Sequence, residues 1–260
     1  MRATSGHTIH ASLLACTLLL AACSKPAEEA AAPAPAPVAE APAATAAPAA
    51  AAPRVVDQLF TAEVIGMNLA YVDKLAGPAV RSEDRRHLYR TDGCELTLRT
   101  DEADKAVQAV EVAITPSCQL SLEPLFNSFA GEPPLQLQAL NFGNFGKLLG
   151  GASYHADCLS MCGNAADPVV SLYMEGPRAL HLLEFAIQAP LVNGPALDAA
   201  ETWRSAMEQA ESETYVVDTR FNCEPQRFQA VADKAFAPVK PAVFIFGRGL
   251  GYDAEAGDCA

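Results

Sequence analysis

Two cysteines close together, Cys158 and Cys162, are the clearest candidates for metal chemistry in this sequence. With His155 and Asp157 just before them, they offer sulfur, nitrogen and oxygen ligands of the kinds that zinc takes. A structural zinc site needs four ligands, and nothing else in the sequence supplies a second pair at metal-ligand spacing. We therefore predict no metal and no other cofactor, and we expect the two cysteines to staple a turn.

Residues for acid–base or nucleophilic catalysis are also scarce. Beyond the N-terminal region the histidines are His87, His155 and His181, and no G-x-S-x-G segment presents a nucleophilic serine. Glu111 and Glu184 recur at matching places and could form an acid pair. Two glutamates on the solvent side of two strands explain the recurrence more simply, so we predict that the protein is not an enzyme.

The N-terminus carries the pattern of a covalent lipid anchor. The apolar run 11–20 is too short to span a bilayer, which takes about 20 residues. Residues 20–23, Leu-Ala-Ala-Cys, resemble the lipobox of bacterial lipoproteins, in which a peptidase cuts before the cysteine and the cysteine is acylated. The resemblance implies membrane attachment through acyl chains on Cys23, and Ser24 implies the outer membrane, with the domain in the periplasm. Residues 13–16 also match the box but leave too little apolar sequence before them.

A spacer follows the anchor. Residues 26–53 include 16 alanines and 7 prolines, and the recurring prolines prevent a continuous helix. We expect such a sequence to form a disordered or polyproline-like tether, which reaches roughly 80 Å when extended at about 3 Å per residue. The sequence thus predicts five parts: a signal peptide at 1–22, the lipidated cysteine and tether at 23–53, a first α+β unit at 54–120, a second at 121–190, and a C-terminal extension at 191–260.

Six cysteines remain beyond the tether. An even number in an exported protein predicts three disulfides, for which about 15 connectivities exist. We favour sequential pairing because each pair then brackets a segment expected to fold back on itself. The predicted pairs are Cys94 with Cys118, Cys158 with Cys162, and Cys223 with Cys259.

The charge balance bears on the partner. The chain has 18 Lys and Arg against 31 Asp and Glu, a net charge of −13. Two of those basic and three of those acidic residues precede residue 54, which leaves about −12 for residues 54–260. This surface argues against nucleic acid and against direct attraction to anionic lipid heads. It suits a basic protein partner.

An internal repeat suggests the fold. Residues 74–79 match 147–152, and residues 105–114 match 178–187 at the same offset. We therefore expect an α+β fold with two tandem units, each a short helix followed by an antiparallel hairpin, and a C-terminal extension of two helices and a final strand. The expected helices are 69–75, capped by Asn68, then 144–149, 195–211 and 225–236. The expected strands are 87–89, 94–99, 110–114, 170–174, 183–187 and 243–246.

This arrangement is similar to beta-lactamase inhibitory protein and its relatives, which include small outer-membrane assembly lipoproteins of the SmpA/OmlA type. The segment 66–78, from Gly66-Met67-Asn68 to Gly77-Pro78, looks like the opening of the family's unit, and the match covers about residues 63–189. The cysteine-rich insertion 157–168 departs from that unit. The resemblance implies a concave sheet that binds another protein without catalysis, and it carries over no functional residue.

Strand alternation predicts the two faces of the sheet. The core side has Val110, Val112, Ile114, Leu183, Phe185 and Ile187. The opposite side has Thr97 and the candidate binding residues Glu95, Arg99, Glu111, Tyr173 and Glu184. The sequence thus favours an outer-membrane lipoprotein with a non-catalytic protein-binding domain. The alternative is an inhibitor or immunity protein against a basic envelope hydrolase such as a lysozyme-like enzyme.

Overall fold

A computed structural model gives the structure of the protein, and it describes residues 52–126, 135–163, 167–177, 182–252 and 259. The predicted signal peptide and residues 23–51 of the predicted tether lie outside these residues. Internal contacts divide the chain into two units, Met1–Ala49 and Ala50–Ala260, and all that follows concerns the second. No helix within the described residues is both long and apolar enough to cross a membrane.

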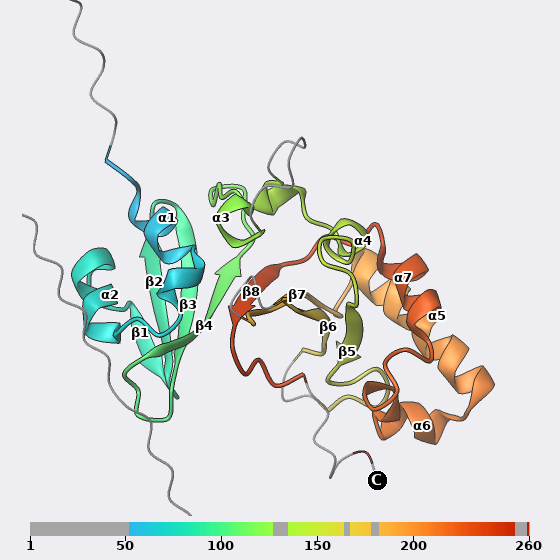
Figure 1. Cartoon of the computed structure of the whole chain (residues 1–260). Helices are drawn as coiled ribbons and strands as arrows, with labels where there is room; N and C mark the ends of the chain where they lie inside the picture. Colours follow the sequence, from blue (N-terminus) through green and yellow to red (C-terminus); the bar gives the residue numbers. More distant parts are fainter. Residues whose placement is uncertain (1–51, 127–134, 164–166, 178–181, 253–258, 260) are drawn as a thin grey trace, which may run out of the picture. The chain divides into compact units, whose positions relative to one another are not determined.

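The fold is α+β, as predicted (Figure 1). The helices are α1 (Val55–Leu59), η1 (Ala62–Val64), α2 (Leu69–Ala76), α3 (Glu123–Phe126), η2 (Leu137–Ala139), α4 (Phe142–Phe145), α5 (Gly194–Ala210), α6 (Glu213–Val217), η4 (Arg220–Asn222) and α7 (Gln229–Phe236). The strands are β1 (Arg81–Glu83), β2 (Arg86–Thr91), β3 (Cys94–Thr100), β4 (Val107–Ala113), β5 (Ser153–Ala156), β6 (Val169–Glu175), β7 (Glu184–Pro190) and β8 (Val243–Gly247).

The strands form one 8-stranded antiparallel sheet in the order β1-β2-β3-β4-β8-β7-β6-β5. The last strand of the chain, β8, therefore lies between the two hairpin regions. The sequence instead predicts that this strand belongs to a separate C-terminal extension. Gly247 permits this insertion, because a Cβ atom there would lie 2.5 Å from the Cα of Ala109 on β4. An apolar strand of this kind is stabilised by ladder hydrogen bonds on both sides.

The tandem-unit interpretation is not confirmed by this topology. β4 and β7 both run antiparallel to β8, so they are parallel to each other. β2, β3 and β4 approach β8 from one side and β5, β6 and β7 from the other, and both groups turn the same face to the core. A half-turn about an axis perpendicular to the sheet would exchange the groups but reverse the direction of their strands. A half-turn about the axis of β8 would keep the strand direction but turn the opposite face of one group to the core. In strand order and direction the two halves are therefore related by reflection, so the topology does not confirm a simple tandem duplication.

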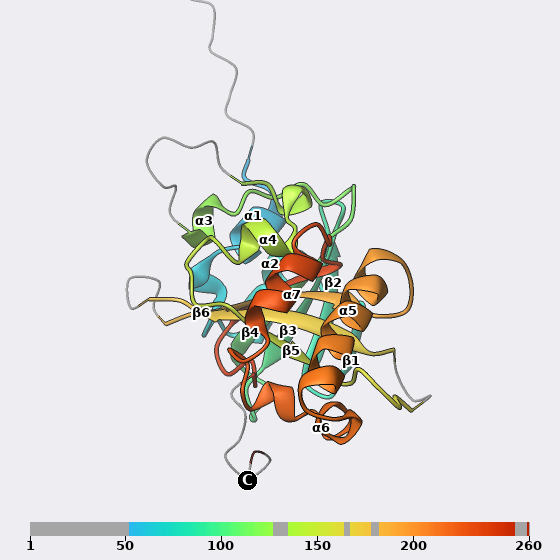
Figure 2. The same ribbon diagram turned by 90° about the vertical axis from the view of Figure 1, so that its right-hand side faces the viewer.

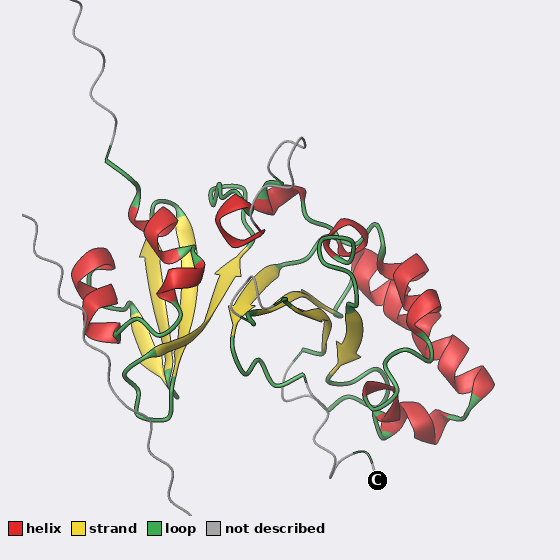
Figure 3. Ribbon diagram, in the orientation of Figure 1, coloured by secondary structure: helices red, strands yellow, loops and turns green. Residues whose placement is uncertain are grey.

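The core lies between the sheet and the helices, and the predicted strand alternation is correct. Val110, Val112, Phe185 and Ile187 are fully buried on the helix side, and Leu183 is 1% exposed. Figure 3 distinguishes the helices from the strands, and α2 contacts β2 while α5 contacts β7. In Figure 2, α5 and α7 lie side by side, in agreement with their extensive contact.

Local sequence signals explain several element boundaries. The side chain of Asn68 accepts a hydrogen bond from the N–H of Ala70 (2.9 Å) and so caps α2, as predicted. Gly77 ends that helix with a φ of 81°, which favours glycine. The helix expected at 144–149 instead covers Phe142–Phe145, because Asn141 and Asn144 form a reciprocal capping box one turn earlier.

Three disulfides join the six cysteines in the predicted sequential order. The bond between Cys94 and Cys118 ties the start of β3 to the segment after β4. The bond between Cys158 and Cys162 closes the turn after β5, so neither thiolate is available as a metal ligand. The third bond ties Cys223, after η4, to Cys259. Such a framework is usual in oxidising compartments.

Candidate binding site

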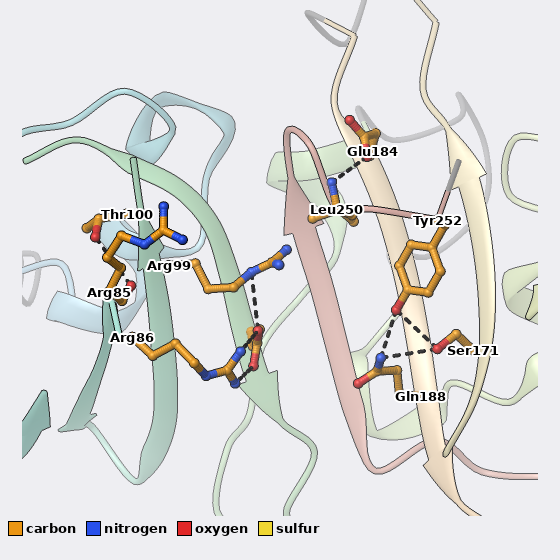
Figure 4. A network of polar contacts seen from close by, with 10 residues as sticks. Arg85, Arg86, Arg99, Thr100, Ser171, Glu184, Gln188, Leu250 and Tyr252 are labelled. Atoms are coloured by element: carbon orange, nitrogen blue, oxygen red, sulfur yellow. Dashed lines mark hydrogen bonds and ion pairs between the residues drawn. The ribbon is translucent and has the colours of Figure 1, made fainter. Parts of the chain in front are cut away.

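The five predicted binding residues lie on the same side of the sheet, opposite the helices. The pairing registers place Thr97, Glu111, Ile245, Ala186 and Tyr173 in one row across the sheet. Arg99, Gly247 and Glu184 belong to the next row, and Glu95 lies on the same side of β3. We call this side the second face. Figure 4 shows its two polar clusters, with β8 between them.

The first cluster is centred on Glu111. Arg86 donates from Nη1 to Oε1 (2.8 Å) and from Nη2 to Oε2 (2.5 Å), which is a bidentate contact between two strands. The Nε atom of Arg99 lies 3.3 Å from Oε1 of the same carboxylate. The Glu111 side chain is only 15% exposed. Arg86 thus holds the carboxylate with the planar arginine fork, and Arg99 adds a second positive charge at ion-pair distance.

Glu95 belongs to the same half of the sheet but not to this cluster. It accepts a hydrogen bond from Nε of Arg90 on the neighbouring strand (2.9 Å), and both side chains are well exposed. Exposed pairs of this kind add little stability. Glu95 and Arg90 therefore add charges of opposite sign to the second face but do little to make it rigid.

The second cluster fixes the chain's own C-terminal segment. After β8, the backbone N–H groups of Gly249 and Leu250 donate to the carboxylate of Glu184 at 2.7 and 2.8 Å. Leu250 packs with Ile245 and Ala186 in a small apolar cluster on the second face. Glu184 is therefore an anchor for this segment, a role that the sequence analysis did not predict.

Tyr252 completes the attachment. Its hydroxyl accepts from the Gln188 amide (2.7 Å) and donates to the Ser171 hydroxyl (3.1 Å), and its ring lies 5.0 Å from that of Tyr173. Burial raises the pKa of the Tyr252 hydroxyl, which keeps the donor protonated. Tyr173 is buried beneath this contact. The half of the second face formed by β6 and β7 is thus covered by residues 249–252. No segment within the described residues covers the half formed by β2, β3 and β4, which we call the open half.

We expect Tyr252→Phe to lower the free energy of unfolding by about 1 kcal/mol, because Ser171 is buried and loses a hydrogen-bond partner. Urea denaturation followed by circular dichroism measures this difference. Tyr71→Phe is the matched control, since Tyr71 is 51% exposed and should change the free energy by less than about 0.5 kcal/mol. Equal stability of the two variants would show that the Tyr252 hydroxyl does not hold the segment.

A third polar cluster was missed by sequence reasoning, because its members share no motif. The buried ring of His87 has Nδ1 2.9 Å from Oγ of Ser82 and Nε2 2.7 Å from Oδ1 of Asp104. An ionised carboxylate only accepts, so Nε2 of His87 donates to Asp104. The hydrogen bonds from Thr100 and His87 lower the pKa of Asp104.

These are the residue types of a serine hydrolase triad. However, the ring is turned the other way round from a triad: Nδ1 of His87 faces Ser82 and Nε2 faces Asp104, whereas in a triad Nε2 faces the serine and Nδ1 the aspartate. The contacts instead join the edge strand to the turn between β3 and β4. We therefore assign this cluster a structural role.

An open pocket of about 490 Å³ lies at the end of the open half of the second face. Its lining includes four arginines from three parts of the chain: Arg85, Arg86, Arg99 and Arg248. Asp84, Asp101 and Glu102 also contribute to it. The pocket is thus the place where basic side chains gather in a chain that is acidic as a whole.

Comparison with protein-family models, with curated proteins and with solved structures found no match to this chain. The resemblance to the beta-lactamase inhibitory protein family, and the function that it implies, therefore stay predictions.

Proposed function

We propose that this chain is an outer-membrane-anchored periplasmic lipoprotein whose folded domain binds another envelope protein without catalysis. The observation that carries the proposal is the open half of the second face. There Glu111 forms a bidentate contact with Arg86 and an ion pair with Arg99, while the other half of the same face is covered by residues 249–252. Charged side chains fixed before binding lose little entropy on association, and they select a partner by charge complementarity.

The envelope part of the proposal rests on two independent features. The lipobox-like residues 20–23 predict the anchor. The three disulfides are typical of an oxidising compartment such as the bacterial periplasm. A tether of the composition seen at 26–53 would then give the domain reach away from the membrane surface.

Affinity capture from the native envelope tests the proposal with a matched pair of variants of the full-length, tagged protein. Thr97→Arg places a bulky charge in the middle of the open half, because Thr97 pairs with Glu111 and Leu88. Thr202→Arg makes the same change on the exposed side of α5. We expect the partner to be retained by the wild type and by Thr202→Arg, and to be lost from Thr97→Arg.

Thermal melts of both variants must show that they stay folded. Retention of the same protein by all three forms, or its loss from Thr202→Arg alone, would contradict the assignment of the open half as the binding surface.

The alternative function, inhibition of a basic hydrolase, draws support from the net charge of −13. The four arginines at the pocket, however, add positive charge to the open half, which does not favour a basic partner at that place. Capture of a basic hydrolase whose retention weakens steeply with rising salt would favour the inhibitor over the adaptor role.

A further inference from the structure

The pocket at the end of the open half contains arginine side chains that the fold does not use. Arg86 and Arg99 are engaged with Glu111, but the guanidinium groups of Arg85 and Arg248 have no hydrogen bond or ion pair to any described residue. Most of the other arginines in the described ranges pair with a carboxylate, as Arg90 does with Glu95. Both side chains are exposed, and Arg85 also helps to lower the pKa of Asp104 through its charge. Two guanidinium groups without an ion-pair partner among the described residues are thus available at one cavity to an external anion.

The backbone holds both of these side chains at the pocket. Arg85 lies in the tight turn between β1 and β2 with a φ of 61°, and its carbonyl accepts hydrogen bonds from the N–H (3.0 Å) and the hydroxyl (3.3 Å) of Thr100. Arg248 follows β8, and its N–H donates to the carbonyl of Gln108 (2.9 Å). The two positions are thus fixed by separate elements, and a ligand that contacts both must lie across the pocket.

The neighbouring Glu111 shows what kind of anion suits this surface. Its carboxylate forms a bidentate contact with Arg86, in the geometry with which guanidinium groups recognise carboxylates, and an ion pair with Arg99. Arg85 and Arg248, which line the same pocket, can bind a carboxylate through their guanidinium groups in the same way. The pocket thus continues a carboxylate-binding pattern that already exists within the protein.

The acidic part of the lining limits the ligand further. Asp101 is used internally, because its carboxylate accepts from the N–H groups of Lys105 (2.8 Å) and Ala106 (3.2 Å). Asp84 and Glu102 remain at the pocket and would repel a polyanion such as a nucleic acid or a densely charged polysaccharide. A ligand with one or two carboxylates among neutral groups avoids this repulsion. A volume of about 490 Å³ accommodates a few residues of an extended peptide.

We propose that this pocket binds a short protein segment that presents one or two carboxylates to Arg85 and Arg248. The proposal rests on the protein-binding function proposed above and specifies the chemistry of the partner at one end of the open half. Free dicarboxylates carry the same groups, so the experiment must distinguish a peptide from a small molecule.

Binding is tested with the full-length protein and the peptide Ac-Ala-Glu-Ala-Glu-Ala-NH2, followed by NMR shifts of the backbone amides. We expect saturable shifts confined to the pocket, at Gly249 and Thr100, with a Kd on the order of 1 mM. The glutamine version of the peptide should bind at least ~10-fold more weakly. Glutarate, which lacks the backbone, should also bind more weakly than the peptide.

The variant Arg85→Ala/Arg248→Ala should lose at least ~10-fold in affinity for the peptide, as loss of charge-assisted hydrogen bonds requires. Arg220→Ala is the control, because Arg220 is an exposed arginine paired with Asp218 and lies outside the pocket. The amide spectrum of each variant reports whether it is folded.

Equal binding of the glutamate and glutamine peptides, or unchanged binding by the double variant, would overturn the proposal. Tighter binding of glutarate than of the peptide would also overturn it, in favour of a small-molecule site. Since no envelope protein enters this experiment, its failure leaves the capture result with Thr97→Arg to decide the proposed function separately.

Discussion

Replacing Phe244 by alanine is expected to lower the free energy of unfolding by about 3–5 kcal/mol. Phe244 is completely buried in β8, where it pairs with Val112 on β4 and with Ile187 on β7. Its ring lies within 6.5 Å of those of Phe60, Phe126, Phe145 and Phe246, which come from both halves of the domain. The truncation therefore leaves a cavity where the two halves meet, and neither half can close it alone.

A loss of this size is a large fraction of the roughly 5–15 kcal/mol by which domains are stable. Urea denaturation followed by circular dichroism measures it. Tyr71→Ala is the control: it also removes an aromatic ring, but one that is 51% exposed on α2, and should cost less than about 1 kcal/mol. A larger loss for Tyr71→Ala than for Phe244→Ala would mean that β8 does not occupy the centre of the sheet.

The faces of the strands could be predicted from sequence because alternation is a local property. Leu96, Leu98, Val110 and Val112 recur with the period of a strand, and the structure buries all four. The cap of α2 is equally local, since it needs only Asn68 and the N–H of a residue two positions on. Such features depend on nearest neighbours, and the rest of the fold cannot change them easily.

The place of β8 could not be predicted in this way. Its pairing with β4 joins residues more than a hundred positions apart, as Val110 and Phe246 show, and no local pattern in either strand specifies the other. The short strands β1 and β5 were missed for a related reason. β1 has 3 residues, all exposed, so it carries no apolar alternation.

The matched glutamates show what the sequence repeat could not predict. The sequence offset equates Glu111 with Glu184, but in the sheet Ile245 pairs with Glu111 on one side and with Ala186 on the other. The two glutamates also differ in their contacts. Glu111 is held by arginine side chains, whereas Glu184 accepts backbone N–H groups from the C-terminal segment. A sequence match therefore identified their common face but not their separate roles.

The covering of half of the second face was also beyond the sequence. Leu250 lies within the glycine-rich stretch 247–251 and Tyr252 follows it directly; such a stretch predicts a turn or tail and gives no indication of where it packs. Their contacts, with Glu184, Ser171 and Gln188, are all made to strands that precede them by more than sixty residues. The open half is consequently a property of the folded chain and not of any single segment.

Cys23→Ser is expected to abolish membrane attachment altogether, because the variant has no thiol on which to carry acyl chains. Several acyl chains on one residue give stable anchoring, whereas a single chain is marginal. The substitution should not disturb the disulfides of the folded domain. All six cysteines of the domain are paired with one another, so Cys23 is not needed for any of the three disulfides.

Labelled palmitate and membrane fractionation measure the result in cells that express the full-length chain. Wild-type protein should take up label and sediment with the outer membrane, and the Cys23→Ser variant should do neither. Cys16→Ser is the matched control, since residues 13–16 carry the competing lipobox-like pattern and Cys16 likewise lies outside the disulfide framework. Uptake of label by Cys23→Ser, together with its loss from Cys16→Ser, would place the anchor at Cys16. If neither the wild type nor either variant takes up label, the lipoprotein hypothesis is wrong. The proposal that the open half binds a protein would then still be tested by the capture experiment.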